Sequence, residues 1–151
     1  MIDYLIAIND NLKDKLINLG FGIEIENNLF LHPVEYVYAV EEGYIEKDNV
    51  YEELKSNFSR FFKLYVVFKD LRKKGYVIRF SVDGPFIRVY RKGYRKGEDR
   101  TLYLLKIVDS NINVSSLLED LYVANKMRKE LVYAIVGDSI KYITITNRNF
   151  N

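Results

Sequence analysis

Apolar residues in the first third of the chain fall into short blocks rather than long periodic runs. Pro33 and Gly43 delimit one block as a helix, because proline lacks only an N–H that the first helical turn leaves unbonded. Asp48 is a good N-cap for another helix. The pattern predicts strands over residues 2–8, 23–25 and 44–46, and helices or helical turns over residues 11–19, 31–40 and 50–55.

The rest of the chain has longer periodicities. Apolar side chains recur every three or four residues from Phe58 to Leu71, which indicates an amphipathic helix ended by Gly75. Blocks rich in β-branched and aromatic residues then alternate with glycine-containing turns. The pattern predicts helices over residues 57–74 and 114–129, and strands over residues 76–80, 86–90, 101–108, 131–136 and 140–146.

This order of elements predicts an α+β or α/β fold made of two small domains. We expect an N-terminal α+β domain over residues 1–56 and a second domain over residues 57–151. In the second, the order helix, three strands, helix, two strands fits one mixed β-sheet flanked by helices.

Composition narrows the chemistry that is available. The chain is 48% hydrophobic and 29% charged with a net charge of +2, which is too mild to indicate a nucleic-acid binder by itself. It has no cysteine and one histidine, His32, so we expect no metal and no cofactor. His32 stands beside Pro33 at a helix start, where a structural role is expected. Apolar runs are too short for a membrane span and no secretory signal is evident, which predicts a cytoplasmic protein.

Two segments carry specific motifs. Residues 65–78 contain Asp-Leu-Arg, two lysines and Gly-Tyr before a strand, and residues 83–90 contain Gly-Pro-Phe leading to Arg-Val-Tyr. Tyr103 and Leu104 follow in the next strand. In order and spacing, over nearly the whole chain, these motifs resemble the archaeal-type tRNA-splicing endonucleases. Further matching segments are residues 31–38, 117–129 and 131–136.

The resemblance implies a restriction-endonuclease-like domain that cuts precursor tRNA at bulge-helix-bulge motifs without a metal. It leaves a 2′,3′-cyclic phosphate and a 5′-OH end. In that family a tyrosine helps to remove the ribose 2′-OH proton, a histidine protonates the leaving 5′-oxygen, and a lysine stabilises the charged phosphorane. Tyr90 matches the tyrosine and Lys129 the lysine, but the position of the histidine, ten residues after Tyr90, holds Arg100. Arginine, with a pKa above about 12, binds phosphate but hardly donates a proton.

A second departure concerns the arginine with which the family clamps a bulge base by a cation–π contact, because Tyr122 occupies that position here. Without the resemblance, Tyr90 and Lys129 would be a strand-end aromatic residue and a solvated lysine. With it, we interpret them as remnants of a catalytic site. Basic residues around two glycines are candidates for RNA contact, or simply solvated surface: Arg88, Arg91, Lys92, Arg95 and Arg100.

The missing acid and clamp predict a structural, non-catalytic subunit that pairs with a paralogous catalytic endonuclease subunit. The resemblance implies a heterotetramer with two copies of each, held by a sheet edge and an acidic loop. Candidates for partner contact are Asp138, Ile143 and Ile145, although Asp138 is the only acidic residue of its loop and a core-facing strand is an equal alternative. Two other functions stay open. One is an active metal-independent RNA endonuclease that uses Tyr90 and Lys129 with Arg100 or water as the acid, and the other is a stand-alone RNA-binding module.

Overall fold

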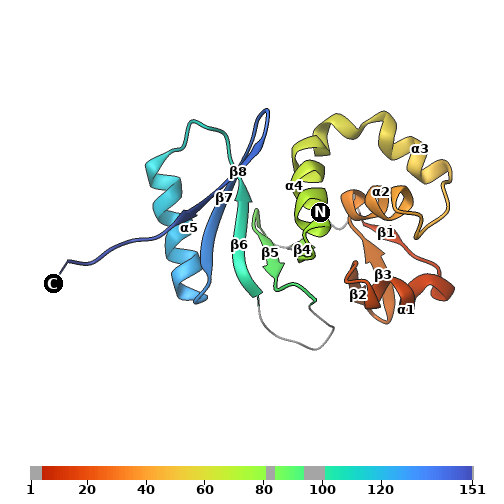
Figure 1. Ribbon diagram of the computed structural model, residues 1–151. Helices are drawn as coiled ribbons and strands as arrows, with labels where there is room; N and C mark the ends of the chain where they lie inside the picture. The colour runs from red at the N-terminus through yellow and green to blue at the C-terminus, as the bar shows by residue number, and fades with distance from the viewer. Residues whose placement is uncertain (1–4, 81–83, 94–100, 151) are drawn as a thin grey trace.

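Two β-sheets and the helices around them form the chain (Figure 1). The computed structural model describes residues 5–80, 84–93 and 101–150. The N-terminal half contains β1 (Ile6–Ala7), α1 (Asp10–Asn18), β2 (Ile23–Ile25), β3 (Asn28–Leu31), α2 (Pro33–Glu41) and α3 (Asn49–Ser56). The 3-10 helix η2 (Phe58–Phe61) leads into α4 (Phe62–Lys73), β4 (Val77–Phe80), β5 (Ile87–Tyr90), β6 (Thr101–Ile107), α5 (Val114–Lys126), β7 (Glu130–Val136) and β8 (Ile140–Ile145).

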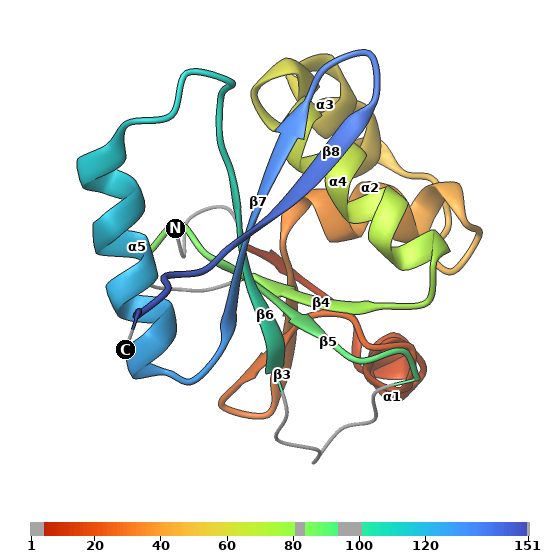
Figure 2. The same cartoon turned by 60° about the vertical axis from the view of Figure 1, so that its left-hand side comes forward.

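The larger sheet has the strand order β4-β5-β6-β7-β8. Its neighbouring strands are antiparallel except β6 and β7, which are parallel. A parallel pair needs a crossover connection, and α5 provides it. Figure 2 shows α5 along one face of the sheet, with α4 and α2 on the other side. The predicted mixed sheet with helices packed against it is therefore confirmed.

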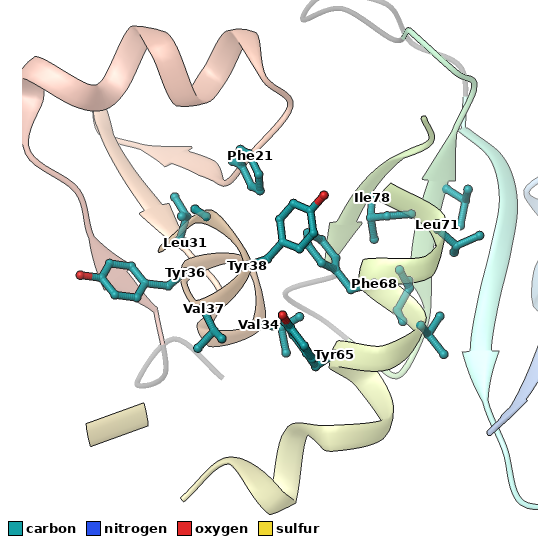
Figure 3. Packing of buried hydrophobic residues seen from close by; sticks show 14 of the residues in the cluster. Phe21, Leu31, Val34, Tyr36, Val37, Tyr38, Tyr65, Phe68, Leu71 and Ile78 are labelled. Atoms are coloured by element: carbon teal, nitrogen blue, oxygen red, sulfur yellow. The ribbon is translucent and has the colours of Figure 1, made fainter. Parts of the chain in front are cut away.

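Helix α4 lies between α2 and the larger sheet, and its apolar side chains contact both (Figure 3). Phe68 stands edge-on to Tyr38 of α2 at 5.4 Å and stacks on Phe80 of β4 at 5.6 Å. Leu71 points toward the sheet, where Ile78 is also buried. One continuous hydrophobic core thus contains residues of both sheets, and a smaller second core lies under α5.

A clasp of polar groups ties the loop before β2 to the rest of the chain. The carboxylate of Glu35 accepts a hydrogen bond from the backbone N–H of Gly22 at 2.8 Å. Arg79 donates to the carbonyl oxygen of Gly22, and Arg72 donates to that of Leu19. A Cβ atom on Gly22 would lie 2.7 Å from the carbonyl oxygen of Phe30, and its φ is +79°. Only glycine fits this close approach without a shift of the backbone.

The structure corrects two of the predicted elements. Residues 44–46 are not a strand, because the N–H groups of Tyr44 and Ile45 turn back to the carbonyl oxygen of Ala39 at the end of α2. Gly43, with φ +84°, allows that turn. The single helix predicted over residues 57–74 is instead η2 followed by α4. Strand β3 was not predicted, and it pairs with both β1 and β2.

His32 is the N-cap of α2. Its Nδ1 accepts from the N–H of Val34 at 3.1 Å, and Glu35 accepts from the N–H of His32 at 3.0 Å, which completes a capping box. Burial lowers the pKa of His32 from 6.5 to about 4. Burial also raises the pKa of Glu35 from 4.5 to about 7, against the lowering effect of its hydrogen bonds and of Arg79 and Arg72.

His32 and Glu35 have opposite effects on the pH dependence of the free energy of unfolding between about pH 4.5 and 6.5. In this window the folded chain holds a proton on Glu35 that the unfolded chain releases. Glu35 therefore lowers the free energy of unfolding as pH rises. The unfolded chain holds a proton on His32 that the folded chain lacks. His32 therefore raises the free energy of unfolding as pH rises. The two slopes therefore largely cancel.

We predict that Glu35→Gln leaves the pH dependence of the free energy of unfolding that comes from His32 without the opposing contribution of Glu35. The free energy of unfolding of the variant, relative to the native chain, should rise by about 2 kcal/mol from pH 4.5 to 6.5. Urea unfolding across this range measures it. His32→Asn keeps a capping side chain and should show the opposite slope, and parallel pH profiles for all three chains would contradict the account.

Candidate functional site

The sheet topology brings three distant points of the sequence to one end of the sheet. Strand β5 ends at Tyr90, which pairs with Thr101 at the start of the antiparallel strand β6. Tyr103 of β6 pairs with Glu130 at the start of the parallel strand β7. The end of β5 and the starts of β6 and β7 therefore lie side by side, with Tyr90 and Lys129 at the same end. We call this the β5 end of the sheet.

Tyr90 is buried, with 9% of its surface exposed. The ladder between β5 and β6 shifts register between Val89 and Tyr90. A bulge of this kind re-aims the side chain next to it and is common at the ends of strands. The extra residue lies on β6, where Leu102 stands between Thr101, which pairs with Tyr90, and Tyr103, which pairs with Val89. Tyr90 therefore keeps the alternation of β5 and points to the face of the sheet opposite Val89.

Lys129 does not lie on a helix, which corrects the prediction that α5 extends to residue 129. The helix ends at Lys126, and Arg128 adopts a positive φ of 58°. The N–H of Lys129 then donates to the carbonyl oxygen of Ala124 at 2.9 Å. This turn fixes the backbone of Lys129 directly before β7 and leaves its side chain half-buried.

The predicted RNA-contact residues divide into two groups. Arg88, Arg91 and Lys92 are exposed on β5 and just after it. Arg95 and Arg100 lie outside the described residues. The residue after Arg100, Thr101, is buried at the start of β6 and pairs with Tyr90.

A buried polar cluster lies between α5 and the sheet, and the sequence pattern did not reveal it. Asp120 of α5 is 8% exposed and accepts from the hydroxyl of Tyr133 at 2.5 Å and from Nζ of Lys106 at 3.0 Å. Burial and the hydrogen bond to this carboxylate raise the pKa of Tyr133, which keeps it a neutral donor. The cluster joins α5 to β6 and β7, and so holds the turn that carries Lys129.

Tyr122, at the position of the predicted clamp, is 66% exposed on α5. Val114 and Leu118 are also exposed on this helix, at a spacing of four residues. The three residues form an apolar stripe along α5, and the exposed Lys126 follows Tyr122 at the same spacing.

Strand β8 is an edge of the larger sheet and pairs with β7 alone among the described strands. Ile143 is 39% exposed, whereas Ile145 is half-buried and packs against the core under α5. Asp138 is exposed in the loop between β7 and β8, where the N–H of Gly137 donates to the carbonyl oxygen of Ser139 at 3.1 Å. Of the three predicted partner contacts, Ile143 and Asp138 thus face solvent, and Ile145 faces the core.

Within the described residues, no cluster of three His, Asp or Glu side chains could hold a metal ion. None of the described helices combines the length and the apolar character that crossing a bilayer requires.

The fold and the sequence together define the class of protein. The model of the family "tRNA intron endonuclease, catalytic C-terminal domain" matches residues 61–144, from η2 to β8. The chain belongs to the tRNA intron endonuclease family.

Individual relatives agree with this assignment. The chain is 35% identical to the tRNA-splicing endonuclease of Methanopyrus kandleri over 132 residues, which cover 78% of this chain and 72% of that protein. It is 34% identical to the tRNA-splicing endonuclease of Thermococcus kodakarensis over 149 residues, which cover 90% of this chain and 87% of the relative. The chain is also 34% identical to the tRNA-splicing endonuclease of Sulfurisphaera tokodaii over 135 residues, which cover 80% of this chain and 74% of that protein.

We predict that Asp120→Ala lowers the free energy of unfolding by about 3 kcal/mol, because Lys106 and Tyr133 both lose a buried partner. Urea unfolding measures the change. Glu119→Ala removes the exposed carboxylate one residue earlier and should cost less than about 0.5 kcal/mol. Equal losses in the two variants would show that the cluster does not hold α5 on the sheet.

Proposed function

We propose that this chain is the non-catalytic, structural subunit of a tRNA-splicing endonuclease that removes introns from precursor tRNA at bulge-helix-bulge motifs. It pairs with a paralogous catalytic subunit in a heterotetramer with two copies of each, and it positions that subunit on the RNA. Its relatives carry the name of the whole enzyme.

The observation that carries the proposal is Arg100 in place of the proton donor. Cleavage by attack of the 2′-OH needs an acid that gives a proton to the leaving 5′-oxygen near neutral pH, which histidine does and arginine does not. The single histidine cannot substitute, because His32 is 8% exposed and caps α2 in the N-terminal half.

Tyr90 and Lys129 are what this proposal treats as remnants. Strand register keeps both at the β5 end, although the reaction also requires the missing acid. Their retention is also the observation that favours the main alternative, an active subunit with Arg100 or water as the acid.

Support for a partner comes from β8, which pairs only with β7 among the described strands, and from its exposed residue Ile143. An open edge strand offers a row of N–H and C=O groups to another chain, and an exposed isoleucine adds apolar contact area. Asp138 in the adjoining loop supplies one acidic group for docking. The exposed apolar stripe on α5 offers a second surface to a protein partner, because exposed aromatic and aliphatic side chains are common in the centre of protein interfaces.

Reconstitution with a paralogue that keeps the histidine tests the catalytic assignment. We predict that bulge-helix-bulge RNA is cut by the mixture, and that Tyr90→Phe in this chain leaves the cleavage rate unchanged. The same tyrosine-to-phenylalanine substitution in the paralogue should slow cleavage by about 100-fold or more, the usual contribution of a catalytic acid or base. A comparable loss from Tyr90→Phe in this chain would support the active-subunit alternative.

We further predict that Ile143→Glu weakens pairing with the paralogue by at least about tenfold, because an ionised carboxylate would be buried at the edge of β8. Gel filtration with mass measurement follows both the pairing and the stoichiometry. Ile25→Glu makes the same change at a similarly exposed isoleucine, on β2 of the smaller sheet, and serves as the matched control. If Ile143→Glu pairs with the paralogue as tightly as the native chain does, β8 is not part of the interface.

A further inference from the structure

Strand β8 is attached to the larger sheet along one side, because its backbone pairs with β7 alone among the described strands. Its side chains alternate between the two faces of the sheet, so Ile140, Tyr142 and Thr144 lie on the face toward α4. Ile140 packs against the main core, whereas Thr144 is exposed. Tyr142 is therefore the side chain that can connect the middle of β8 to α4.

A cavity of about 320 Å³ lies between the sheet and the end of α4 at this point. Leu71 and Lys74 line it from the helix side, Val132 lines it from β7, and Tyr142 and Thr144 line it from β8. Apolar contact between the helix and the middle of β8 is therefore incomplete, because a void supplies no atoms for close packing. Packing alone does not fix the distance between β8 and α4.

A polar contact connects the two elements beside this cavity. The hydroxyl of Tyr142 donates to Oδ2 of Asp70 on α4 at 2.7 Å, and Nζ of Lys74 donates to the same oxygen at 2.9 Å. Burial and the hydrogen bond to Asp70 raise the pKa of Tyr142, so its hydroxyl remains a donor at neutral pH. A hydrogen bond to an ionised acceptor is roughly twice as strong as a neutral one. We call Asp70 and Tyr142 the β8 tether.

We propose that Asp70 and Tyr142 are positioning residues for partner docking, because their hydrogen bond holds the middle of β8 in the geometry that a partner strand requires. The inference rests on the proposed function, which assigns the outer edge of β8 to the paralogue. A pairing strand must meet the N–H and C=O groups of β8 in register, so movement of β8 away from α4 weakens pairing. Ile143 points to the face opposite Tyr142, and the tether therefore leaves it exposed to the partner.

The competing role of the β8 tether is a contribution to the stability of the whole fold. Tyr142 is half-buried at the border of the main core, whereas α4 is held to α2 and to the sheet by buried side chains such as Phe68. The loss of one hydrogen bond at the sheet edge therefore leaves that core in place. Elements with few buried contacts open locally, at a lower free energy than the whole fold. A local effect on β8 is accordingly favoured.

Amide hydrogen exchange on the chain alone tests the local effect. Tyr142→Phe keeps the ring and removes the hydroxyl, and should speed exchange of the β8 amides about tenfold, as expected for the loss of one hydrogen bond to a charged group. Tyr36→Phe is the matched control, because it removes a part-buried hydrogen bond of Tyr36 to Asp48 at 2.6 Å in the N-terminal half. The control should leave β8 exchange unchanged.

The dissociation constant for the paralogue tests the docking role. Tyr142→Phe and Asp70→Ala should each weaken pairing by about fivefold to tenfold, and the double variant should be no weaker than either single one, because both changes remove the same contact. Asp70→Asn keeps an oxygen that accepts from Tyr142 and should pair within about twofold of the native chain. Tyr36→Phe should pair as the native chain does.

The inference is overturned if Tyr142→Phe leaves either β8 exchange or pairing at the native value. An equal loss of pairing in Tyr36→Phe would indicate a general effect of stability and would also overturn it. A native chain that does not pair with the paralogue contradicts the proposed function itself. A native chain that pairs, with tether variants that pair equally well, contradicts this inference alone.

Discussion

Packing on both sides of α4 is the constraint on which the rest of the structure depends. Phe68 contacts Tyr38 on one side and Phe80 on the other, so the same side chain belongs to the N-terminal half and to the larger sheet. Buried aromatic residues of this size contribute several kcal/mol each, about 3 to 5 kcal/mol when truncated to alanine. The clasp of Arg72 and Arg79 on the loop at Gly22 reinforces the same contact with hydrogen bonds. The larger sheet is thereby held in a fixed relation to the rest of the chain.

That fixed sheet determines what the β5 end can present. Antiparallel pairing of β5 with β6 and parallel pairing of β6 with β7 bring Tyr90 and Lys129 to the same end of the sheet, and Asp120 binds α5 to β6 and β7. Burial and hydrogen bonds stabilise each of these contacts. The arrangement is therefore stable whether or not the chain is catalytically active.

The sequence predicted most of the larger sheet, because short blocks of β-branched and aromatic residues separated by glycine-containing turns are typical of β-strands. It did not predict β3, since the turn before it uses Glu26 and Asn27 with positive φ rather than glycine. The end of α5 was placed too late because Arg128, an ordinary helix former, adopts φ 58°. Asp120 was missed because a polar residue on a helix is usually solvated, and only the fold shows Tyr133 and Lys106 opposite it.

The proposed function requires that this member of the tRNA intron endonuclease family holds a catalytic partner on RNA and does not cut RNA itself. The most direct measurement is the incubation of the purified chain, alone and in excess, with bulge-helix-bulge RNA under single-turnover conditions. We expect bound but uncut RNA, because Arg100 does not donate the proton that the leaving oxygen requires. Products with 2′,3′-cyclic phosphate and 5′-OH ends, lost again on Tyr90→Phe, would contradict the account.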